Sequence, residues 1–190
     1  MIENQTHRLH LRHVLAAAGL AGLALAVAVV ASNPRAAGAA APDPITAVPL
    51  ATERSVFTDD VGIDIRLGIE GREELLIEHA DASHVAVVEI TVQPGASFPW
   101  HTHPGTALAG LQQGELIYVY ADDCVERSYL TGTMFVDPGG DNVHLAFNPS
   151  ETTPAVVVVT FIGVPAEGGL TLPVDDDQQA ALDEACGIVR

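Results

Sequence analysis

The sequence predicts an all-β fold of short strands, a sandwich or a barrel, followed by one short helix near the C-terminus. Runs rich in β-branched residues recur roughly every ten residues from Arg54 onward, the spacing typical of such folds. Glycines and prolines separate these runs, as expected of turns. Only the stretch from Asp175 to Ala185 favours a helix after the N-terminal region, with acidic residues at its start, where the helix dipole stabilises them.

The expected strands follow one another in chain order. The clearest covers residues 84–92, which are rich in valine and isoleucine and end at Pro94-Gly95. The last predicted strand, residues 154–162, is almost entirely apolar, so we expect it to be buried. Residues 54–83 are expected to add one or two edge strands. The strands predicted after the first are residues 116–120, 125–130, 133–136 and 154–162, with a further short strand that carries His144.

Two blocks of histidine, glycine and proline form the strongest candidate site. Alternate side chains of a strand share a face, so His101 and His103 are expected to point the same way. His144 must then come from a separate strand brought alongside, and three imidazoles can together hold one divalent metal ion. The same alternation predicts that Asn148 shares the metal face or closes its rim. The other fixed positions of the two blocks are Gly95, Gly114, Gly132, Pro138 and Gly140.

These blocks resemble the two motifs of the cupin superfamily, and residues 84–163 resemble a single cupin domain. The resemblance implies a jelly-roll barrel, the double-stranded β-helix, with His101, His103 and His144 as metal ligands. The first motif departs from the family at one position. A glutamate ligand follows the second histidine in cupins, and the spacing to Gly114 places Ala107 there. The site rim would therefore carry Ala107 in place of a carboxylate, and a bound divalent ion would keep its formal charge of +2.

The resemblance implies a protein that binds one divalent metal and acts on a small organic molecule. Loss of the carboxylate makes the site less suited to Mn(II) and favours Fe(II), with Zn, Ni or Cu as alternatives. The implied reaction is ring opening or thiol oxidation by a three-histidine iron dioxygenase. Hydrolysis by a zinc-bound water is a variant. The sequence assigns no catalytic residue beyond the metal.

Two other functions remain alternatives. One is a non-catalytic module at the cell surface that binds a metal or a small ligand. The other is a degenerate barrel that serves as an interaction domain. Cupins include enzymes and binding proteins, so the fold alone does not distinguish these functions.

The N-terminal region has the features of an export signal. Arg8 and Arg12 precede residues 14–31, which consist of alanine, leucine, valine and glycine alone. Positive charge ahead of such a run places the N-terminus inside and the following domain outside, extracellular or periplasmic. We therefore expect a hydrophobic helix that is either a signal peptide or a membrane anchor. The expected organisation is a leader at 1–41, a linker at 42–53, the barrel at 54–165 and a tail with a short helix at 166–190.

The two cysteines, Cys124 and Cys186, are expected to form a disulfide in an exported protein. It would tie the barrel to the C-terminal tail and stabilise the fold by ~4 kcal/mol through closure of a long loop. Two unrelated buried thiols are the alternative.

The charge of the chain narrows the range of partners. It holds 25 acidic residues against 8 basic residues, a formal net charge of −17 at pH 7. Such a surface repels nucleic acid and anionic lipid. We therefore expect a small-molecule ligand, no nucleic acid, and membrane contact only through the N-terminal segment. By analogy with cupins, a homodimer is also predicted.

Overall fold

The computed structural model describes residues 43–189. The leader expected at 1–41 and its hydrophobic helix therefore lie outside the described residues. Within residues 43–189, no helix has the length and apolar character needed to cross a membrane.

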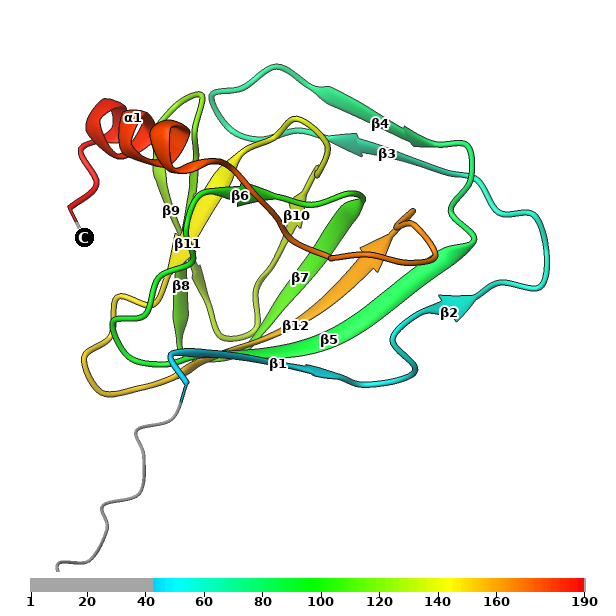
Figure 1. The fold of residues 1–190 in the computed structure, drawn as a ribbon, viewed down its shortest axis with the longest axis horizontal. Helices are drawn as coiled ribbons and strands as arrows, with labels where there is room; N and C mark the ends of the chain where they lie inside the picture. The colour runs from blue at the N-terminus through cyan, green and yellow to red at the C-terminus, as the bar shows by residue number, and fades with distance from the viewer. Residues whose placement is uncertain (1–42, 190) are drawn as a thin grey trace, which may run out of the picture. The chain divides into compact units, whose positions relative to one another are not determined.

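The described residues form two antiparallel sheets and a separate hairpin (Figure 1). One sheet has the order β1-β5-β12-β7-β10, and β2 also pairs with β5. The other has the order β13-β6-β11-β8-β9, and β3 pairs with β4. The strands of the first sheet are β1 (Ile45–Pro49), β2 (Ser55–Val56), β5 (His84–Val92), β7 (Thr106–Gln113), β10 (Met134–Asp137) and β12 (Ala155–Ile162). Those of the second are β6 (His101–Thr102), β8 (Glu115–Tyr120), β9 (Glu126–Leu130), β11 (His144–Phe147) and β13 (Leu172–Pro173), and the hairpin is β3 (Ile63–Leu67) with β4 (Leu75–His79).

The predicted all-β jelly roll is confirmed, as is the helix near the C-terminus. Helix α1 (Asp176–Cys186) begins after Asp175, whose side chain accepts a hydrogen bond from the Gln178 N–H. It ends at Gly187, which adopts the left-handed conformation common at helix C-termini.

Strand β7 was not predicted, although it lies in the middle of the first sheet. Its sequence, TALAGLQQ, is poor in the β-branched residues that signal a strand. Pairing with β12 on one side and β10 on the other specifies it instead. Small residues on this strand leave space inside the barrel, and Ala107 and Ala109 line the cavity described below.

The interpretation of residues 42–53 as a linker is wrong for Ile45–Pro49. This segment is β1, and it pairs with β5 along its whole length. Main-chain pairing requires no apolar side chain, and three of its five residues are exposed. The segment does contain three β-branched residues, Ile45, Thr46 and Val48, but the Ala/Pro/Gly-rich stretch around it led to the linker interpretation.

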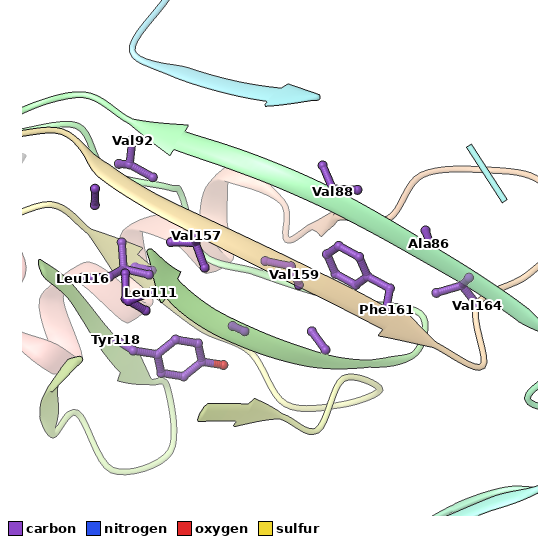
Figure 2. Close-up of a cluster of buried hydrophobic side chains, with 14 of the residues drawn as sticks. Ala86, Val88, Val92, Leu111, Leu116, Tyr118, Val157, Val159, Phe161 and Val164 are labelled. Atoms are coloured by element: carbon purple, nitrogen blue, oxygen red, sulfur yellow. The ribbon is translucent and has the colours of Figure 1, made fainter. Parts of the chain in front are cut away.

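Buried side chains form a core between the two sheets (Figure 2). Val88 and Val92 of β5 and Val157, Val159 and Phe161 of β12 contribute from the first sheet. Tyr118 of β8 packs against them from the second sheet. Since side chains alternate along a strand, the neighbours of Tyr118 belong to another cluster on the opposite face of β8.

Helix α1 is held on this opposite face by specific contacts. Trp100 is fully buried there, and its Nε1 donates a hydrogen bond of 2.8 Å to Asp183 Oδ1. The Gln179 side chain accepts from Trp100 N at 2.9 Å and donates to Trp100 O at 2.6 Å. Cys124 and Cys186 form a disulfide, with their Cα atoms 5.0 Å apart. These contacts fix the segment directly ahead of His101.

Candidate metal centre

The structure brings His101, His103 and His144 together inside the barrel. One nitrogen from each ring lies within 4.8 Å of the others. The arrangement follows from strand pairing, because β6 and β11 are antiparallel and place His144 directly opposite His101. All three side chains are buried. A buried cluster of this kind could hold a metal ion.

Main-chain carbonyls determine how two of these rings present their nitrogens. His101 Nδ1 lies 2.7 Å from Pro99 O, and His103 Nδ1 lies 2.6 Å from Leu170 O. A carbonyl oxygen only accepts, so each Nδ1 carries the proton and donates. The Nε2 atom of each ring therefore offers a lone pair. This is the usual arrangement of a metal-binding histidine, in which the other nitrogen is anchored to the protein.

Burial keeps His101 and His144 neutral. It lowers the pKa of His101 to about 4, with a smaller contribution from the neighbouring His103. It also lowers the pKa of His144 well below the ordinary value, assisted by the two other imidazoles. The His144 ring is stacked on Tyr118, with ring centroids 4.6 Å apart. Neutral imidazoles bind metal without first losing a proton.

Sequence reasoning missed a buried carboxylate in the site. Asp137, the last residue of β10, is 2% exposed. Its Oδ1 accepts a hydrogen bond of 2.7 Å from the Gly139 N–H. Its Oδ2 lies 3.4 Å from His103 Nε2 and 3.2 Å from His144 Nδ1. The sequence places this residue just before the Pro138 turn, but only the pairing of β10 with β7 turns it toward the histidines.

The surroundings of Asp137 fit a bound cation. Its Oδ2 makes no hydrogen bond of ordinary geometry with any residue in 43–189. Burial raises the pKa of Asp137, while His103, the Gly139 N–H and the Tyr118 hydroxyl lower it. The nearby His103 Nε2 also offers a lone pair, so two electron-rich atoms face each other. A divalent ion bound here would satisfy both atoms.

A small, largely apolar cavity opens beside the histidines. Its volume is about 70 Å³. Pockets for drug-sized ligands span roughly 300–1,000 Å³, so this cavity suits water and molecules of few heavy atoms. No arginine or lysine lines it among the described residues. Besides the histidines and Asp137, its lining comprises Ile90, Val92, Phe98, Ala107, Ala109, Leu116, Tyr118, Phe135, Ala146, Val157, Val159, Phe161 and Thr171.

The two residues predicted at the site rim have different locations. Ala107 lines the cavity as expected. Asn148 does not, and its placement on the metal face is wrong. Strand β11 ends at Phe147, so the alternation that we extended to Asn148 stops one residue earlier. The buried amide of Asn148 instead donates to Val92 O at 3.0 Å and Thr153 O at 2.8 Å, which ties together the ends of neighbouring strands.

Residues 88–161 match the sequence profile of the cupin domain. The chain therefore contains a cupin domain over these residues. Cupins commonly bind metals, and the site described above lies within the matched region. No curated protein matches the sequence.

Several solved structures are similar to part of this chain. The polyketide cyclase RemF from Streptomyces resistomycificus is 18% identical, with a TM-score of 0.40, over 50% of this chain and 65% of the cyclase. A cupin-like protein from Thermotoga maritima is 19% identical, with a TM-score of 0.41, over 52% of this chain and 72% of that protein. An RmlC-like cupin from Shewanella frigidimarina is 19% identical, with a TM-score of 0.37, over 45% of this chain and 76% of that protein.

The chain thus spans just under two thirds of the cyclase. Similarity of this degree transfers neither a reaction nor a substrate to this cupin.

The lowered pKa of His101 predicts that acid destabilises the metal-free protein. The pKa is about 4 in the folded chain, against an ordinary value of 6.5 expected when unfolded. Between these values the unfolded chain binds more protons, so the free energy of unfolding falls as the pH falls. The shift corresponds to about 3 kcal/mol between pH 7 and pH 4.

Urea unfolding across this pH range, compared with His101→Gln, measures the effect. Asp137 has a raised pKa and contributes with the opposite sign, but it is present in both proteins. The wild type is expected to lose more stability than His101→Gln as the pH falls. Parallel pH profiles for the two proteins would contradict the prediction.

Proposed function

We propose that this cupin binds one Fe(II) ion through His101, His103 and His144 and oxidises a small organic molecule with dioxygen. One observation carries the proposal: three buried imidazoles converge beside a small, largely apolar cavity. Three protein nitrogens leave further positions on a six-coordinate ion open for substrate and oxygen. When bound, Fe(II) would supply the activation of dioxygen.

The chain's own residues would hold the histidines and exclude bulk water. The carbonyls of Pro99 and Leu170 anchor two of the imidazoles through their Nδ1 atoms. The Phe161 ring packs against His103 with centroids 5.0 Å apart, and Phe98 packs against His101 at 5.6 Å. Exclusion of water from the site would strengthen electrostatic interactions with a bound substrate and limit side reactions.

The cavity also restricts the substrate. Its small volume favours a molecule of few heavy atoms. Its lining offers apolar contacts and few polar groups, without a cationic side chain to bind an acid. We therefore infer that such a substrate would be anchored through the metal, by a thiol or another donor atom, while its remaining atoms contact apolar side chains.

A non-catalytic module that binds a metal or a small ligand is the second candidate. The observation that favours it is Ala107, which leaves the cupin glutamate position without a ligand. Both functions predict metal binding, and only the first predicts oxygen consumption.

We also propose that the domain functions outside the cytosol. The uncharged run at 14–31 supports export. The disulfide between Cys124 and Cys186 supports an oxidising compartment. Protease added to intact cells is expected to digest the domain if it is anchored at the surface, and a secreted form is expected in the medium or periplasm. Recovery of the full-length chain from the cytosol alone would contradict export.

Metal analysis of the protein, purified without a histidine tag and loaded anaerobically with Fe(II), tests the proposal. We expect about one equivalent of iron, and its loss in the double variant His101→Ala/His144→Ala. His84→Ala is the matched control, because His84 lies outside the cluster and is expected to leave the iron content unchanged. Oxygen uptake should then appear with a member of a panel of small thiols and other metal-binding molecules.

Three results separate the candidates. Iron binding with oxygen uptake supports the oxygenase. Iron or another metal without oxygen uptake supports the non-catalytic module. A protein that stays empty with Fe(II), Zn(II) and Mn(II) contradicts both.

A further inference from the structure

The strand that carries Asp137 lies beside the strand that lacks the cupin glutamate. Strands β7 and β10 are antiparallel, and Asp137 is the direct partner of Ala107. Directly opposed residues of an antiparallel pair project from the same face of the sheet, with Cβ atoms about 5 Å apart. Both residues line the same cavity. A carboxylate at position 137 therefore enters the space next to the one that a longer side chain at position 107 would occupy.

The two oxygens of Asp137 have different surroundings. Oδ1 has a structural role, because it accepts the Gly139 N–H and holds the turn after β10. Oδ2 has no such role and lies within 3.4 Å of ring nitrogens from two of the three histidines. A carboxylate charge that is buried without a compensating positive charge destabilises the fold, and a nearby cation removes that penalty.

We propose that Asp137 supplies the negative charge that compensates the metal ion, in place of the glutamate absent at position 107. Asp137 lies on the strand next to the one that carries position 107, and it stays beside the histidines. The inference rests on the proposed metal centre and specifies its charge. With Asp137 ionised, three neutral imidazoles and one carboxylate give the bound divalent ion a formal charge of +1.

A double-mutant cycle in metal affinity tests this assignment. Co(II) serves as the probe, because its visible absorption reports binding directly, and competition with a chelator gives the Kd. Asp137→Asn keeps the shape of the side chain and an oxygen for Gly139 but removes the charge. We expect it to weaken Co(II) binding at least tenfold, the effect typical of removing a carboxylate that supports a metal site.

Restoring a carboxylate on the neighbouring strand should reverse the loss. Ala107→Glu added to Asp137→Asn is expected to recover most of the affinity. Ala107→Glu in the wild-type background should change the affinity by less than threefold, because the charge is already present. Such a difference between backgrounds measures coupling between the two positions. Asp141→Asn is the control, since it removes an equal charge from an exposed residue nearby and should leave the Kd unchanged.

Several results would overturn the assignment. The first is that the Asp137→Asn variant binds Co(II) as tightly as the wild type. The second is that Ala107→Glu raises the Co(II) affinity equally in the wild-type and Asp137→Asn backgrounds. If Asp137→Asn does not fold, a large gain in affinity from Ala107→Glu in the wild type still contradicts the assignment. Circular dichroism melting without metal identifies that case. If the wild type binds no metal, the metal centre itself is refuted. If it binds metal and the affinity does not depend on Asp137, only this inference is refuted.

Discussion

The close approach of two main-chain turns holds the candidate metal centre together. A Cβ at Gly139 would lie 2.2 Å from Gly105 O, and the φ of Gly139 is +70°, so glycine is required there. The Gly140 N–H donates to His103 O at 2.9 Å, and Thr102 Oγ1 donates to Gly140 O at 2.7 Å. This junction joins the end of β10 to the segment after β6. It therefore places Asp137 against His103, although the two are far apart in the sequence.

The apolar interior of the barrel changes the protonation of His101, His144 and Asp137. Burial favours the neutral forms of His101 and His144, which leaves their lone pairs available at moderately acid pH. The same burial disfavours an isolated carboxylate, so Asp137 is stable in its ionised form only beside a positive charge. A bound divalent ion would stabilise both groups, because it would bind the neutral nitrogens and pair with the carboxylate. The electrostatics of the barrel thus support the metal site even though the cupin glutamate is absent.

The sequence predicted the part of this arrangement that depends on spacing. The two blocks around His101 and His144 specified a jelly roll, and the strands at 84–92 and 154–162 stood out through their β-branched residues. Strand β7 could not be found in this way, because its sequence is poor in β-branched residues and pairing with β12 and β10 holds it in place. Asp137 was overlooked for a related reason. The register of β10 on β7 determines that the Asp137 side chain points toward the histidines, and no local sequence pattern predicts this register.

Asn148 shows the opposite error. A period-two pattern was extended past the end of β11, where the chain leaves the strand and the amide turns to cap neighbouring main-chain groups. Local periodicity predicts the direction of a side chain only as far as the strand continues. The strand end is determined by tertiary hydrogen bonds.

Anomalous diffraction from crystals of the protein grown with Co(II) would show whether the three histidines bind one metal ion. We expect one strong peak inside the barrel, about 2.1 Å from the Nε2 atoms of His101 and His103 and from a ring nitrogen of His144. Absence of a peak at this position, with the three imidazoles ordered and the ion bound elsewhere or not at all, would contradict the proposed metal centre.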